Sequence, residues 1–128
     1  MKKLERIMLI DDDEGNNFYN KFILREVDAS EEIVVFQNGI DALNYLNQKH
    51  LVNLILLDVN MPKMNGWEFL DEYEKLDQTS KDSIIVVMLT SSINPDDQQR
   101  AQSYSTVRKF MNKPIEPEMV EEVLKLFG

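Results

Sequence analysis

Short runs of consecutive apolar residues recur along the chain and predict the strands of a sheet. Two of these runs, residues 54–57 and 84–89, are apolar at every position rather than at alternate positions. Such continuous runs are typical of strands that are covered by protein on both faces, as in a parallel sheet between two helical layers. The predicted strands are Ile7–Ile10, Ile33–Phe36, Leu54–Leu57, Ile84–Leu89 and Val107–Met111.

Between these runs, hydrophobic residues recur at the three- and four-residue spacing of a helix, and each set predicts one buried stripe. The predicted stripes are Tyr19, Phe22, Ile23 and Val27; Ile40, Leu43 and Leu46; Trp67, Leu70 and Tyr73; and Val120, Val123, Leu124 and Phe127.

A further helix is predicted in the segment Pro95 to Tyr104, although that segment is mostly polar. Asn94 can cap its first turn, a proline suits the first helical position, and the two aspartates that follow complement the helix dipole. Because the segment offers only Ala101 and Tyr104 as apolar anchors, we expect this helix to be weakly docked.

Strands and helices therefore alternate along the chain, which predicts an α/β fold with a doubly wound, flavodoxin-like parallel sheet of five strands and five helices. Right-handed crossovers and helices on both faces favour the strand order 2-1-3-4-5. The length of 128 residues suits one domain, residues 1–128. In such sheets ligands bind outside the carboxyl ends of the strands, near the first and third strands.

Charge and composition exclude several classes of protein. With 14 Lys and Arg against 23 Asp and Glu, the net charge of -9 repels nucleic acid and anionic membranes. The chain has no cysteine, no signal-peptide core after its charged N-terminus, and no apolar run near the roughly 20 residues needed to cross a bilayer. We therefore expect a cytoplasmic protein without direct contact to nucleic acid or membrane.

Polar residues directly follow four of the predicted strands, so all of them are expected at one edge of the sheet. They are the runs Asp11–Glu14, Asp58, Thr90–Ser92 and Asn112–Pro114. Carboxylates from the first and third strands would lie close together there, which is unfavourable unless a cation compensates their charge. An all-oxygen cluster without His or Cys suits a hard cation, so Mg²⁺ is the predicted metal.

The same residue types suit phosphoryl transfer. A carboxylate such as Asp58 can attack phosphorus, a cation such as Lys113 can stabilise the phosphoryl oxygens, and Thr90 can donate a hydroxyl. Taken singly, each residue has an ordinary structural interpretation as a helix cap, a turn residue, a strand end or an exposed lysine. The functional interpretation is favoured because all of them are expected at one edge.

The segment Leu56 to Gly66, LLDVNMPKMNG, resembles the phosphoacceptor segment of bacterial response-regulator receivers, and the likeness extends over the whole chain. The resemblance implies that Asp58 accepts a phosphoryl group and that Asp12 binds Mg²⁺ directly. It also implies that the Asn60 backbone carbonyl completes the protein ligands and that Asp11 acts mainly through metal-bound water.

For the remaining residues, the resemblance implies that Lys113 pairs with the phosphoryl group and that the Lys113–Pro114 bond is cis. Thr90 is expected to swing its hydroxyl toward the phosphoryl group, and Phe110 matches the aromatic switch position. Asn65 stands where the family often has Asp, but Asn caps the following helix equally well.

The function implied is a phosphorylation switch of two-component signalling that catalyses its own phosphorylation and dephosphorylation, not an enzyme with separate substrates. Its expected partners are a sensor histidine kinase or phosphotransfer protein and an unidentified downstream protein. The protein itself is expected as a monomer or a homodimer. Because the sequence stops at Gly128, directly after the last predicted helix, we expect a stand-alone receiver.

Two other functions are compatible with parts of the pattern. A haloacid-dehalogenase-like phosphohydrolase also uses an aspartyl nucleophile, Mg²⁺, Thr and Lys, but that family requires a second Asp two residues after the nucleophile, where this chain has Asn60. A phosphate-independent binding module would need none of these residues, and the complete set argues against it.

Overall fold

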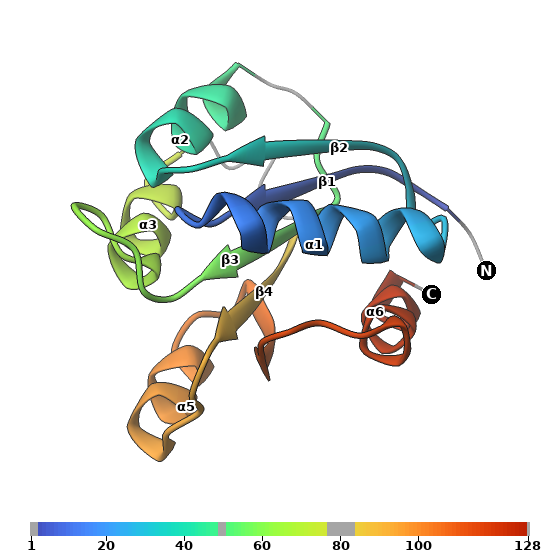
Figure 1. Cartoon of the computed structure of the whole chain (residues 1–128). Coiled ribbons are helices and arrows are strands. Elements are labelled where there is room, and N and C mark those ends of the chain that lie inside the picture. The colour runs from blue at the N-terminus through green and yellow to red at the C-terminus, as the bar shows by residue number, and fades with distance from the viewer. Residues whose placement is uncertain (1–2, 49–50, 77–83, 128) are drawn as a thin grey trace.

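A five-stranded parallel sheet with the order β2-β1-β3-β4-β5 forms the centre of the computed structural model, which describes residues 3–48, 51–76 and 84–127. Five α-helices and one short 3-10 helix lie among these residues (Figure 1). The predicted α/β class and strand order are confirmed. In chain order the elements are β1 (Leu4–Ile10), α1 (Glu14–Glu26), β2 (Ser30–Phe36), α2 (Gly39–Asn47), β3 (Leu54–Asp58), α3 (Gly66–Tyr73), β4 (Ile85–Thr90), α5 (Pro95–Gln102), β5 (Val107–Asn112), α6 (Pro117–Leu124) and η1 (Lys125–Phe127).

Helices cover both faces of the sheet, as the continuous apolar strands predict. In β3 every residue is buried, and its side chains alternate between two cores. Ile55 and Leu57 face the core formed with α2, α3 and α5, whereas Leu54 and Leu56 face the core formed with α1 and α6. Because helices cover both faces of the sheet, a ligand can reach it at the carboxyl ends of the strands. No helix in the described ranges is long and apolar enough to span a membrane.

The predicted buried stripe of α1 is wrong in part. Ile23 is buried, but Tyr19 and Phe22 are 39% and 54% exposed. The helix instead buries Leu24 together with two asparagines. One of them, Asn17, donates from Nδ2 to the backbone carbonyl of Asp11 at 2.7 Å, which turns this polar face of α1 toward the end of β1.

In α2, Ile40 is 56% exposed and not buried as predicted. The helix packs through Gly39, Ala42 and Leu46 instead. Its first residue approaches the loop before α3 so closely that a Cβ on Gly39 would lie 2.7 Å from Sδ of Met64. This close approach sets which side of α2 faces the core.

The polar segment after β4 does form a helix, α5, as predicted. The side chain of Asn94 accepts from the backbone N–H of Asp97, and Pro95 occupies the first turn. Ala101 is the one buried residue of α5, so the helix has a small apolar contact with the rest of the domain. The prediction of weak apolar anchoring is therefore confirmed.

Candidate functional site

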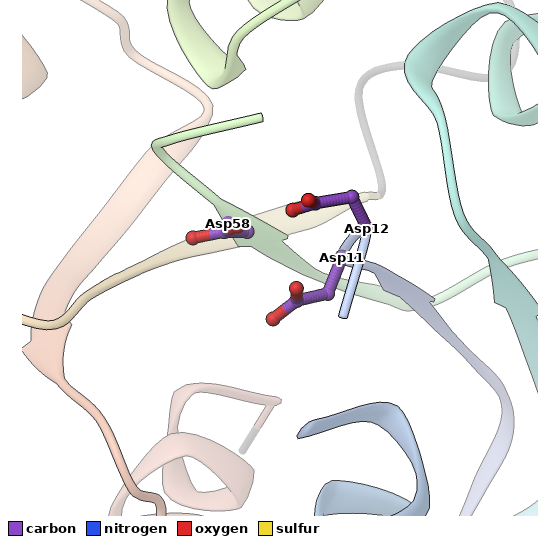
Figure 2. A group of neighbouring side chains, drawn as sticks. All are labelled: Asp11, Asp12 and Asp58. Atoms are coloured by element: carbon purple, nitrogen blue, oxygen red, sulfur yellow. The ribbon is translucent and has the colours of Figure 1, made fainter. Parts of the chain in front are cut away.

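The register of the strands brings the polar residues of the predicted site to one edge. Ile10 of β1 pairs with Leu57 of β3, so the residues that follow them, Asp11 and Asp58, lie side by side. Figure 2 shows the side chains of Asp11, Asp12 and Asp58 gathered at this point. Their carboxylates each offer an oxygen within 4.8 Å of the others. An open cavity at this edge is lined by Asp11, Asp12, Asp13, Asn16, Asp58, Asn60, Ser91, Lys113 and Pro114.

Lys113 bridges two of the carboxylates. Its Nζ lies 2.8 Å from Oδ1 of Asp58 and 3.0 Å from Oδ2 of Asp11, and both aspartates are buried. Burial alone lowers the pKa of Lys113, but the hydrogen bonds to these carboxylates raise it above its usual value. The ammonium group is therefore charged at neutral pH and compensates one of the negative charges.

Burial and, to a smaller extent, the nearby charge of Asp11 together raise the pKa of Asp58 to about 6, against the lowering effect of the Lys113 hydrogen bond. The Asn60 backbone N–H also donates to Oδ1 of Asp58, at 3.4 Å. At neutral pH Asp58 is thus largely ionised but poorly stabilised. That environment favours any process that brings positive charge to this carboxylate.

The donor set fits a hard divalent cation. Asp11, Asp12 and Asp58 supply only carboxylate oxygens, and Lys113 balances one of three negative charges. Mg²⁺ prefers such ligands and binds with one or two carboxylates plus water. Asn60 lines the same cavity and therefore also lies at the site.

The loop after β3 is held against the site by Gly66. A Cβ at this position would lie 2.8 Å from the carbonyl oxygen of Asp58 and 3.0 Å from Cα of Val59. The Gly66 backbone N–H donates to the carbonyl of Val59 at 2.8 Å. Asn65 and Glu68 form a capping box at the start of α3, so the predicted capping by Asn65 is confirmed.

The predicted switch residues lie beside the site and not within its cluster of carboxylates. Thr90 ends β4, where its side chain is occupied by its own loop: Oγ1 donates to the carbonyl of Ser92 at 3.2 Å and accepts from its N–H at 3.3 Å. Phe110 lies on β5 near Trp67. The Lys113–Pro114 peptide bond is cis, as predicted.

Sequence reasoning missed two features of the site. It did not predict the contact between Lys113 and Asp11, which joins residues 102 positions apart. It also missed Asn16 as a lining residue, whereas Ser91 belongs to the polar run predicted at this edge. The position of Asn16 depends on how the first turn of α1 meets the strand edge.

The charge of Asp58 gives a testable pH dependence of stability. In the folded protein its pKa of about 6 exceeds the usual 3.8, so the folded state keeps a proton that the unfolded chain has released. Stability therefore falls as the pH rises through this window, by about 3 kcal/mol for a shift of roughly two units. In metal-free buffer, Asp58→Asn is expected to be more stable than the wild type at pH 8 and nearly equal to it at pH 4.

Urea unfolding at both pH values measures this difference. A stability gain of the same size at pH 4 and pH 8 would show that the substitution acts through something other than the buried charge.

The five-stranded parallel sheet thus carries acidic residues at the carboxyl ends of its first and third strands and a lysine directly after its fifth strand. The family model described as "Response regulator receiver domain" matches residues 7–125. The chain belongs to this family and is a receiver domain of two-component signalling.

Individual relatives agree with this assignment. Response regulator Rcp1 of Synechocystis sp. is 32% identical over an alignment of 97 residues that covers 71% of this chain and 65% of Rcp1. The sensor histidine kinase RcsC of Escherichia coli is 29% identical over 91 residues, which are 71% of this chain but 9% of RcsC. The chain thus spans less than two thirds of the length of either relative. A two component response regulator from Cytophaga hutchinsonii has a crystal structure that superposes with a TM-score of 0.92 at 33% identity, covering 98% of this chain and 97% of that one.

Proposed function

We propose that this receiver, as one domain spanning residues 1–128, accepts a phosphoryl group on Asp58 in a Mg²⁺-dependent reaction and then changes which protein it binds. The phosphoryl donor is the phosphohistidine of a sensor histidine kinase or phosphotransfer protein. The observation that carries the proposal is the Asp58 carboxylate, buried at the strand edge, 2.8 Å from Lys113 and beside two further carboxylates.

In the reaction, a carboxylate oxygen of Asp58 attacks phosphorus. A P–O bond forms while the P–N bond of the phosphohistidine breaks, and the imidazole nitrogen keeps the electron pair. Lys113 is already within hydrogen-bond distance of Asp58 and pairs with the incoming phosphoryl oxygens. Attack by water on the phosphorus of the aspartyl phosphate restores the Asp58 carboxylate and releases inorganic phosphate.

Asp11, Asp12, Asp58 and the Asn60 carbonyl would hold the Mg²⁺, which when bound compensates the negative charge of the phosphoryl oxygens. The excess of carboxylates over cations at this edge supports that assignment. Asp12 is the exposed one of the three aspartates, which suits a role as a direct ligand that reaches the metal from the open side of the site.

The conformational change on phosphorylation is expected to begin at the residues that end β4 and follow β5. Thr90 would leave its contacts with Ser92 and donate its hydroxyl to the phosphoryl group, and Phe110 would move with it. The backbone N–H of Lys113 donates to the carbonyl of Thr90 at 2.8 Å, so the two strand ends move together. The change is then expected at α5, β5 and α6, which follow these residues along the chain.

Acetyl phosphate with Mg²⁺ tests the proposal directly. Intact-mass measurement is expected to show the addition of one phosphoryl group, and a chelator is expected to prevent it. Steady turnover of small phosphate esters without a phosphorylated form at equilibrium would instead support a phosphohydrolase, and no reaction with either would support a phosphate-independent binding module.

Asp12→Ala is expected to weaken Mg²⁺ binding by about tenfold or more, because it removes a direct ligand. It is also expected to raise thermal stability in metal-free buffer, since one of several repelling charges disappears. Mg²⁺ titration by calorimetry or fluorescence measures the first effect.

Asp13→Ala is the matched control for this substitution. Asp13 is the next carboxylate along the chain, but its side chain accepts from the Asn16 N–H and caps α1. Its loss is expected to lower stability by about 1 kcal/mol and to preserve most of the Mg²⁺ affinity. Equal Mg²⁺ affinity in Asp12→Ala and the wild type would remove Asp12 from the ligand set.

A further inference from the structure

Trp67, the second residue of α3, joins the loop of the phosphoacceptor to the C-terminal part of the domain. Its ring is buried and lies 6.0 Å from the ring of Tyr104, at an interplanar angle of 27°. The ring of Phe110 is 6.3 Å away on β5. On α5, the guanidinium carbon of Arg100 lies 4.7 Å from the Trp67 ring centroid, the arrangement of a cation–π contact.

A second contact also joins α3 to the segment after α5. The hydroxyl of Tyr104 donates to Oδ1 of Asp71 at 2.7 Å. Asp71 is one helical turn beyond Trp67, so both residues reach the end of α5 from the same side of α3. Burial, together with the hydrogen bond to Asp71, raises the pKa of Tyr104, so the hydroxyl remains a donor at neutral pH.

These contacts matter because α5, which otherwise packs on β5, buries little apolar surface. Ala101 is the one buried residue of α5, and Tyr104 lies two residues beyond the end of the helix, with its backbone N–H donating to the Ala101 carbonyl at 3.1 Å. A helix with few buried apolar contacts is among the first elements to move. Its position is therefore sensitive to the contacts with Trp67 and Asp71.

We propose that Trp67, Asp71, Arg100 and Tyr104 form a latch that holds α5 against α3 in the unphosphorylated protein and opens when Asp58 is phosphorylated. The inference rests on the proposed function, which it deepens by assigning the restraint on the output helix. No residue of the latch belongs to the site at the strand edge.

The latch is connected to that site in two ways, through Gly66 and through Phe110. Trp67 follows Gly66, which is packed against the backbone of Asp58 and Val59. Phe110 lies two residues before Asn112, the partner of Thr90 in the register of β4 and β5. A shift of Phe110 as Thr90 turns toward the phosphoryl group therefore changes the surface on which Trp67 packs, and with it the contacts to Arg100 and Tyr104.

Contacts made in one state and lost in the other shift the equilibrium between the two states when they are removed. Loss of the cation–π contact or of the hydroxyl hydrogen bond is expected to favour the open state by about two- to tenfold each. The variants Arg100→Gln and Tyr104→Phe remove these contacts with little change of shape.

Hydrogen exchange of the unphosphorylated protein tests the holding function. Both variants are expected to exchange the α5 amides of Gln98–Ser103 about two- to tenfold faster than the wild type. Arg25→Gln is the control, since Arg25 is an exposed arginine on α1, outside the latch. Unchanged exchange of α5 in both latch variants would contradict the latch.

Beryllofluoride with Mg²⁺, as a mimic of the phosphoryl group, tests the opening. Trp67 is the sole tryptophan, so its fluorescence reports on the latch directly. Beryllofluoride is expected to change the Trp67 emission of the wild type, and Arg100→Gln and Tyr104→Phe are expected to reach half-saturation at about two- to tenfold lower concentration.

These measurements distinguish a failure of the proposed function from a failure of the latch alone. A wild-type protein that binds no beryllofluoride by mass or fluorine NMR would contradict the proposed function. A wild-type protein that binds it, with half-saturation unchanged in both latch variants, would contradict the latch alone.

Discussion

Asp58→Asn is expected to abolish phosphorylation by acetyl phosphate while the protein folds normally. The carboxamide keeps the size and shape of the side chain but is not a nucleophile toward phosphorus. Lys113 keeps its contact with Asp11, so the strand edge retains part of its charge pairing. Intact-mass measurement over time, in the presence of Mg²⁺, gives the phosphorylated fraction directly.

Asp28→Asn is a suitable control for the chemical change from Asp to Asn. Asp28 lies on the surface, where it pairs with Lys3, and its positive φ of 53° is one that Asn adopts readily. This variant is expected to be phosphorylated like the wild type. Phosphate incorporation by Asp58→Asn at the wild-type rate would show that another residue is the acceptor.

Lys113 is expected to be the second residue with a large effect, and substitution by Arg tests whether its charge alone suffices. The compact ammonium reaches two buried carboxylates at 2.8 Å and 3.0 Å, whereas a planar guanidinium is larger and directs its donors differently. Lys113→Arg is therefore expected to lose the change at α5 that accompanies phosphorylation, although its net charge is unchanged. Hydrogen exchange with and without beryllofluoride measures this loss.

Lys113→Met removes the charge as well and is expected to slow phosphorylation on the order of a hundredfold. It leaves Asp11 and Asp58 buried without a counter-charge, at a cost of about 3 kcal/mol in metal-free buffer at pH 8. The cost is expected to shrink toward pH 5, because the pKa of Asp58, already about 6, lets this carboxyl take up a proton.

The control for the arginine substitution is Lys75→Arg. Lys75 pairs with Glu72 on the surface of the domain and is expected to tolerate arginine without effect. If Lys113→Arg responded to beryllofluoride as fully as Lys75→Arg, direct pairing of Lys113 with the phosphoryl group would be refuted.

Local sequence patterns were sufficient for the order of elements and for the class of fold. The continuous apolar runs of β3 and β4 predict strands covered on both sides, and a parallel sheet with right-handed crossovers has few possible strand orders. The same order places Asp11, Asp58 and Lys113 at carboxyl ends of strands. The set of candidate residues was therefore predictable, because strand direction follows directly from the alternation of strands and helices.

Helix orientation was less predictable from periodicity. Tyr19, Phe22 and Ile40 fit apolar stripes but are exposed, whereas Asn17 and Asn20 are buried. Periodicity measures which residues share a face, but the face that turns inward also depends on the neighbour it meets. In α1 that neighbour is a backbone carbonyl, and in α2 it is the side chain of Met64, against which Gly39 packs closely.

The sequence by itself determined the α/β class, the strand order and the residues gathered at the strand edge, because these follow from patterns a few residues long. Only the tertiary structure decided that Lys113 bridges Asp11 and Asp58, and that Trp67 stacks on Tyr104 beneath Arg100. Such contacts join side chains far apart in the sequence. Their geometry depends on strand register and helix packing, which distances along the chain do not encode.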